Sequence, residues 1–252
     1  MLIDNTSDNN LTSWEVENAR VTAFYKGSVT TQDWWNELLD QQPEAERKNN
    51  KTGETEYVGT IDDNQLVMRI RPERIDWFVK PDNIFEEINR PHSIGVFPEP
   101  LSSFIDITSR WLKLETLPLI NRLAFALTLS FSVDDLQQGQ KEIQKYLHNI
   151  RLEADIEELL FQVNRPRVSK IQELRDLKIN RLSKWSLAKW IMSYLTADGQ
   201  TIKMQSGNLI RLELDINTSS EYTGDFDSKI LADLLDELKN FSFEIVEKGD
   251  VP

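Results

Sequence analysis

Large apolar and small residues alternate along residues 120–131, INRLAFALTLSF. Because successive side chains of a strand point to opposite faces of a sheet, this period of two predicts a β-strand. One face of this strand is bulky and the other is small, which predicts a central strand with a thick core layer on one side. The bulky positions are Leu123, Phe125, Leu127, Leu129 and Phe131.

The same alternation predicts further strands. The second half of residues 14–25 is one, and residues 57–81 form a meander with a tight turn at Asp62–Asn64. Residues 209–218 alternate between an apolar and a charged face, which indicates an antiparallel sheet with one face in water. Residues 177–194 are interpreted as a strand, although a helical stripe also fits them.

Four segments carry apolar residues at helical spacing, and in three of them residues that suit an N-cap precede the apolar residues. Thr30, Thr31 or Asp33 begins the first segment, Ser102 or Ser103 the second, and Asp227 or Ser228 the last. The four predicted helices cover residues 30–40, 101–114, 134–147 and 227–248. Residues 1–12, 41–55 and 91–100 lack periodicity and are predicted to be a polar start, a flexible loop and a proline-rich crossover.

Runs of strands followed by single helices predict the α+β class, with antiparallel sheets and helices packed on one side. We predict two fused lobes, residues 1–133 and 134–252. An internal duplication is one interpretation, because an Asn-Arg pair recurs in motifs at residues 88–91, 120–123, 163–166 and 179–182. Chance combined with turn chemistry is the alternative, because the spacing of the motifs differs between the halves.

Composition excludes several classes of protein. The 252 residues contain no cysteine, which rules out disulfides, thiolate catalysis and cysteine-ligated metals. The first ten residues lack the basic and apolar regions of a signal peptide, and no run reaches the roughly 18 apolar residues that a membrane span needs. We therefore expect a cytoplasmic protein without membrane association.

Catalytic motifs are missing from the sequence. The two histidines, His92 and His148, belong to no HExxH motif, and neither GxSxG nor a glycine-rich phosphate loop occurs. The carboxylates Asp62 and Asp63 suit a hairpin turn, and Glu213 and Asp215 suit a solubilising strand face. We therefore expect no metal, no cofactor and no enzymatic activity, with a hydrolase that uses an unrecognised site as an alternative.

The net charge of −13 conceals an uneven distribution. Residues 161–193 hold eight Lys or Arg against two acidic residues, whereas residues 205–252 hold four against eleven. We call residues 165–189 the basic band. The candidate binding residues in and beside it are Arg165, Arg167, Lys170, Arg181, Lys184, Trp185 and Trp190.

Three interpretations of the basic band remain open. Its cations pair with the acidic C-terminal half of the chain, they bind the acidic surface of a protein partner, or they bind nucleic acid or a nucleotide. The last interpretation rests on basic residues interleaved with tryptophans, since phosphate pairing and base stacking act together in such sites.

The segments LINRLAF, INRLSKWS and LELDINT resemble a sporadically distributed family of uncharacterised bacterial proteins of similar size. The resemblance spans most of residues 14–247 and implies a prokaryotic protein, since some family members lie beside mobile or defence genes. We therefore expect a non-catalytic accessory subunit of a multiprotein complex, such as an antiviral defence module. Protein partners or a second copy of the chain are the expected binding partners, ahead of nucleic acid.

Overall fold

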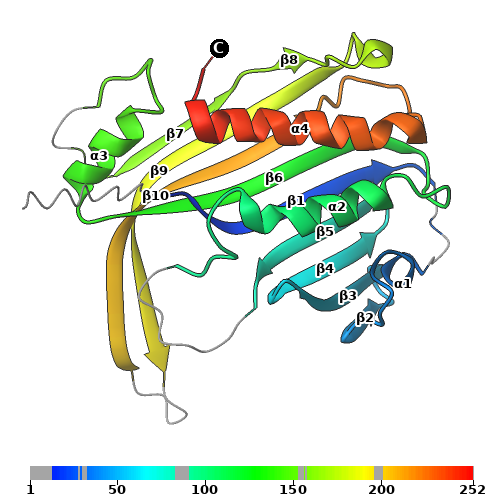
Figure 1. Ribbon diagram of the computed structural model, residues 1–252, viewed down its shortest axis with the longest axis horizontal. Helices are drawn as coiled ribbons and strands as arrows, with labels where there is room; N and C mark the ends of the chain where they lie inside the picture. Colours follow the sequence, from blue (N-terminus) through cyan, green and yellow to red (C-terminus); the bar gives the residue numbers. More distant parts are fainter. Residues whose placement is uncertain are drawn as a thin grey trace, which may run out of the picture.

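The computed structural model describes residues 13–27, 29, 33–82, 91–152, 156, 158–195 and 201–251, without the side chains of residues 192–195 and 201–205. One antiparallel sheet of ten strands dominates the described residues (Figure 1). Its order is β2-β3-β4-β5-β1-β6-β10-β9-β7, and β8 also pairs with β9. The predicted α+β class is confirmed, with a single continuous sheet.

The strands are β1 (Glu15–Tyr25), β2 (Ala45–Asn49), β3 (Glu54–Ile61), β4 (Asn64–Arg71), β5 (Arg74–Pro81), β6 (Ile120–Val133), β7 (Leu159–Asn164), β8 (Arg167–Val168), β9 (Lys178–Leu195) and β10 (Thr201–Thr218). The helices are α1 (Trp34–Leu39), α2 (Ser102–Trp111), α3 (Leu136–Gln144) and α4 (Ser228–Lys248), and two short 3₁₀ turns are η1 (Glu99–Leu101) and η2 (Gln172–Leu174).

The order of elements repeats along the chain. Each half starts with a strand and a helix, continues with four strands and ends with a helix: β1 to α2, then β6 to α4. In each half the first strand pairs with the last, as β1 with β5 and β6 with β10, and the halves meet where β1 pairs with β6. This order groups β6 with the second half, whereas the predicted lobe boundary at residue 133 lies after β6.

The Asn-Arg motifs do not occupy matching places in the two halves. Residues 120–123 begin β6, whereas residues 179–182 lie inside β9. Residues 163–166 span the end of β7, and residues 88–90 fall outside the described residues. The element order therefore supports a duplication, and the motif pattern that first suggested one does not.

All four helices pack on one face of the sheet, which we call the helix face (Figure 1). The core between the helices and the sheet contains a row of buried tryptophans. Trp35 lies parallel to Trp77 with ring centroids 5.9 Å apart, and Trp111 meets Trp77 edge-on. Gly59 lies beneath this row, because a Cβ at that position would come within 2.7 Å of Trp35 Cζ2. We call the opposite face of the sheet the open face, since none of the described helices packs on it.

Most predicted elements are confirmed, and two details are wrong. The predicted loop at residues 41–55 contains β2 and the start of β3, an edge pair whose exposed charged side chains hid its periodicity. The predicted serine cap at the start of α2 is absent, because η1 leads directly into the helix from Leu101. Asp33 caps α1 and Asp227 caps α4, as predicted, while Thr30 and Thr31 lie outside the described residues.

The strand interpretation of residues 177–194 is confirmed by β9, which continues with β10 beyond the rest of the sheet as a two-stranded ribbon (Figure 1). The pairing of β10 with β6 starts at Asn208, so residues 201–207 pair with β9 alone. Trp190 lies at the base of this ribbon over Gly207, where a Cβ would come within 2.7 Å of Trp190 Nε1. Ile191, next along the ribbon, is 62% exposed.

Candidate functional site

Three arginines of the basic band contact the C-terminal helix and the residues just after it. Arg165 donates two hydrogen bonds to Asp250, at 2.7 and 2.9 Å, and Arg167 Nη1 donates to Glu244 Oε2 at 2.7 Å. Lys170 lies beside them, with Nζ 5.5 Å from the centre of the Phe241 ring. The hydrogen bond to Asp250 is the main cause that raises the pKa of Arg165.

Arg181 is the most buried cation of the band, with 2% exposure beneath α4. Its guanidinium lies over Phe241, and its Nη2 is 3.6 Å from Glu244 Oε2. Within the described residues its Nε and Nη2 have no hydrogen-bond partner. Burial, followed by the charge of Arg167, lowers the pKa of Arg181 despite the opposing effect of Glu244.

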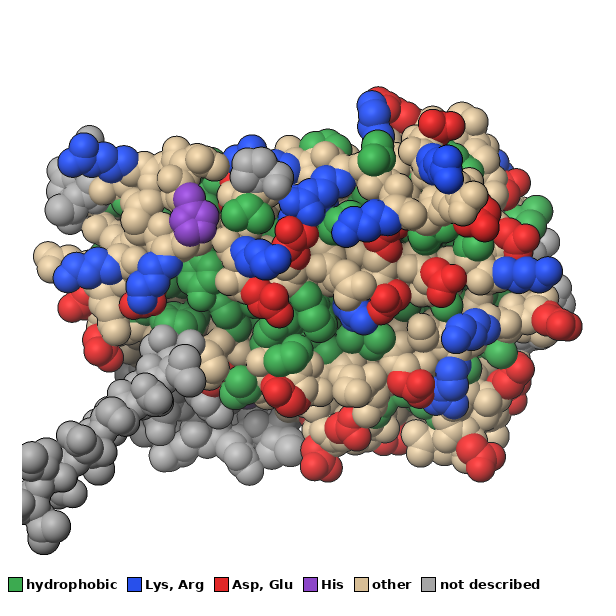
Figure 2. All heavy atoms as spheres, turned by 45° about the horizontal axis from the view of Figure 1, so that its top comes forward, with side chains coloured by type: hydrophobic (Ala, Val, Ile, Leu, Met, Phe, Trp, Pro, Cys, Tyr) green, Lys and Arg blue, Asp and Glu red, His purple; other side chains and the backbone are tan. Residues whose placement is uncertain are grey.

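Side chains alternate between the two faces of β9, so the remaining candidate residues do not share one surface. Trp185 points into the core and is fully buried, whereas Lys184 points to the open face and donates to Glu213 at 2.9 Å. Trp190 lies at the base of the ribbon. Figure 2 shows blue and red side chains intermixed on its view of the molecule, without a continuous basic strip. Of the three interpretations of the band, internal pairing is what the geometry shows for Arg165, Arg167 and Arg181.

Arg181→Met is expected to leave the free energy of unfolding unchanged or to raise it by about 1 kcal/mol, because an apolar side chain of similar length avoids the cost of a buried cation. Urea denaturation measures the change. Arg165→Met is the matched control and should lower the free energy of unfolding by about 2 kcal/mol, since it leaves Asp250 buried without its partner. A loss above about 2 kcal/mol for Arg181→Met would contradict the expectation.

Glu244 makes the stability of this cluster depend on pH. Burial raises its pKa, but the hydrogen bond from Arg167 and the charges of Arg167, Arg181 and Lys248 outweigh burial, so the pKa lies below the usual 4.5. A carboxyl with a lowered pKa in the folded state stabilises the fold above its unfolded pKa, and this stabilisation is lost as the pH falls through the folded pKa.

We therefore expect Glu244→Gln to be less stable than the wild type at pH 7, with a difference that shrinks as the pH falls below 4.5. Urea denaturation at pH 7, 5, 4 and 3 measures both proteins. Glu247→Gln removes the same charge from the exposed side of α4 and should stay within about 0.5 kcal/mol of the wild type. A constant difference at every pH would show that Glu244 acts through packing alone.

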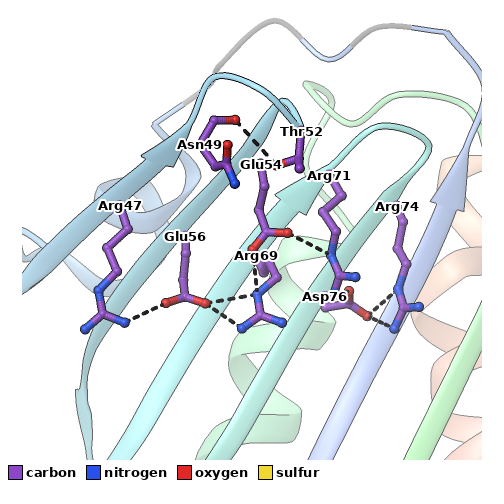
Figure 3. A network of polar contacts seen from close by, with 9 residues as sticks. All are labelled: Arg47, Asn49, Thr52, Glu54, Glu56, Arg69, Arg71, Arg74 and Asp76. Atoms are coloured by element: carbon purple, nitrogen blue, oxygen red, sulfur yellow. Dashed lines mark hydrogen bonds and ion pairs between the residues drawn. The ribbon is translucent and has the colours of Figure 1, made fainter.

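A ladder of alternating charges crosses four strands of the open face (Figure 3). Arg47 on β2 and Arg69 on β4 both bind Glu56, and Glu54 on β3 lies 3.4 Å from Arg69 and 3.6 Å from Arg71. These side chains belong to neighbouring strands, so each ion pair also fixes the register of the strands that carry it.

Asp76 is the buried end of this ladder, with no exposed surface. It accepts two hydrogen bonds from Arg74, at 2.9 and 2.7 Å, one from Arg71 at 3.2 Å, and one from the Thr22 hydroxyl at 2.6 Å. Each of the three carboxylates in the ladder, those of Glu54, Glu56 and Asp76, is therefore paired with arginine. These ion pairs hold neighbouring strands together, which explains why the charges are there.

Beside the ladder, two hollows of about 840 and 440 Å³ adjoin each other on the open face and share Asn18 and Phe78. Val58, Val67 and Phe78 lie opposite one another on β3, β4 and β5 and form the apolar floor of the larger hollow. Ala126 and Leu182 continue this floor in the smaller hollow. Together the hollows form one groove across the strands, which we call the open-face groove.

Two cations of the groove lack carboxylate partners within the described residues. Arg20 lines the smaller hollow, and its buried Nε has no hydrogen-bond partner there. Lys80 lines the larger hollow and is exposed. Most of the groove's acids are already paired: Glu17 with Arg211, Glu56 with Arg69, and Glu213 with Lys184. Asp215 also lines the smaller hollow; it accepts a hydrogen bond from Asn217 and has no cation partner within the described residues. The described lining therefore presents two unpaired cations, Arg20 and Lys80, and one unpaired carboxylate.

None of the candidate binding residues predicted from the sequence, apart from Lys184, lines this groove. A signal for it is present in the sequence, because Val67 and Phe78 are apolar residues at positions that otherwise carry glutamine, arginine, aspartate or lysine on the polar side of β4 and β5. Only the pairing of β3, β4 and β5 shows that Val58 continues the same row.

The described part of the chain contains no group of three or more acidic or histidine side chains placed to hold a metal ion. None of the described helices is both long and apolar enough to cross a membrane.

Scans against protein-family models, curated proteins and solved structures gave no match for this chain. The resemblance to the bacterial family therefore stays a prediction.

Proposed function

We propose that this protein is a non-catalytic binding subunit of a multiprotein complex and that it holds a segment of a protein partner in the open-face groove. The observation that carries the proposal is that the described helices cover one face of the sheet (Figure 1), whereas the other face has two adjoining hollows. Ligand sites combine an apolar floor with a few polar groups that fix orientation, and this groove has both.

The test compares two double variants of the tagged full-length protein in its native cell. Val58→Thr with Phe78→Thr removes apolar surface from the groove but keeps strand-forming residues. Leu119→Thr with Val168→Thr is the matched control, because both of these side chains are more than 60% exposed and neither lines the groove. Affinity purification with mass spectrometry identifies the proteins that accompany each form.

We expect the same partner to accompany the wild type and the control, and to be lost from the groove variant. Thermal unfolding of the groove variant close to that of the wild type shows that the loss is not due to misfolding. The proposal is wrong if no partner is enriched, or if the groove variant retains the partner as well as the control does.

A nucleic-acid role is less well supported by the geometry. Arg165, Arg167 and Arg181 point toward α4 and its end, where carboxylates already occupy the first two. Phosphate contacts need cations that are free to face the ligand.

A further inference from the structure

We infer that the open-face groove recognises an extended acidic segment, with two carboxylates on alternate residues next to apolar side chains. This inference rests on the proposed function and adds the chemistry of the partner. Its basis is the position of Arg20 and Lys80 beside the apolar floor.

Arg20 and Lys80 are diagonal neighbours on adjacent strands. Arg20 on β1 lies opposite Phe78 on β5, and Lys80 lies two residues beyond Phe78 on the same strand. Diagonal neighbours of an antiparallel pair are about 7–8 Å apart. Alternate side chains of an extended peptide point the same way and are spaced by about 7 Å. Two carboxylates in the pattern acid-x-acid therefore match the two cations.

The apolar floor gives the segment a direction across the sheet. Phe78, Val67 and Val58 follow one another from β5 to β3, with neighbouring strands about 4.8 Å apart. The row is level with Arg20, and Lys80 lies two residues to one side of it on β5. A segment that runs along the row therefore meets Arg20 at one end and Lys80 from the side, and its next alternate residue lies over Val67 or Val58. Apolar residues at those positions bury surface against the row, whereas charged ones do not.

Nucleic acid fits this face less well than an acidic peptide. Single strands bind by stacking successive bases on several aromatic rings, but Phe78 is the one Phe, Tyr or Trp among the described residues that line the two hollows. The net charge of −13 also repels a polyanion more strongly than a peptide with two carboxylates.

Fluorescence anisotropy of labelled peptides tests the inference with the full-length protein. The probes are peptides with the core DSDSLSL, its neutral counterpart NSNSLSL, its basic counterpart KSKSLSL, and a ten-nucleotide oligothymidine. We expect the acidic peptide to bind about ten-fold more tightly than the neutral one at low salt, with a preference that falls as salt rises.

The variants assign the preference to specific side chains. Arg20→Gln and Lys80→Gln should each reduce the preference for the acidic peptide several-fold, and the double variant should abolish it. Arg122→Gln is the matched control, because Arg122 is on the same face, has no carboxylate partner within the described residues, and lies outside both hollows over Phe24. It should change the affinity by less than about two-fold.

Four outcomes would overturn the inference: no binding of the acidic peptide, equal binding of the neutral peptide, an equal effect of Arg122→Gln, or tighter binding of the oligonucleotide. If one of these occurs while the groove double variant still loses its cellular partner, the proposed function remains and only the acidic chemistry is wrong. If the cellular partner is also unaffected by the groove variant, both proposals fall.

Discussion

Trp77→Ala is expected to lower the free energy of unfolding by about 4 kcal/mol. Trp77 has no exposed surface, lies parallel to Trp35 with 12° between the ring planes, and meets Trp111 edge-on at 6.0 Å. Removing the indole opens a large cavity, and the two neighbouring rings belong to different helices, so neither can move to fill it without losing its own contacts.

Urea denaturation followed by far-ultraviolet circular dichroism measures this change. Trp190→Ala is the control, since Trp190 is half-buried at the base of the ribbon and outside the row of buried tryptophans; its loss should cost about 1 kcal/mol. Equal losses for the two variants would show that the row of tryptophans does not anchor α1 and α2 to the sheet.

Asp76→Ala is the second variant with a large expected effect, a loss of about 3 kcal/mol in the free energy of unfolding. The carboxylate is fully buried and serves Arg71, Arg74 and Thr22 together. Both arginines have about a third of their side chains exposed, so water can compensate part of the lost pairing. This exposure keeps the expected loss at the lower end of the range for buried ion pairs.

Asp106→Ala is the matched control, because it removes the same side chain from an exposed ion pair with Arg110 on α2. Exposed pairs on helices contribute little, so the control should lose less than about 0.5 kcal/mol. If Asp76→Ala also lost less than about 1 kcal/mol, the ladder would not stabilise the sheet. Its arginines would then be better explained as part of a binding surface.

Much of the fold can be predicted from the sequence because alternation is a local property. In residues 66–70 and 75–79, the alternation of apolar and polar residues predicts which side chains face the core, without any tertiary information. The same reasoning identified β6 and residues 209–218 of β10, and helical spacing identified the last helix. Alternation missed β2, where four of the five side chains are exposed and no apolar period exists.

The candidate site was harder to predict, because a groove across strands joins residues that are distant in the sequence. The basic band shows the opposite problem, since its charges are neighbours in the sequence but are divided between two faces. Arg181 and Lys184 differ by three positions on one strand, an odd number, and therefore point to opposite sides of the sheet. Proximity along β9 predicted a shared surface that strand geometry excludes.

By itself, the sequence determined the α+β class, the faces of the main strands and the net charge. The tertiary structure decided which acids neutralise Arg165 and Arg167, and which side chains form the open-face groove. The physical reason is that periodicity fixes the direction of a side chain within its own element. Ion pairing and cavity shape depend instead on which strands become neighbours, and here β1 joins β6 across a separation of about a hundred residues.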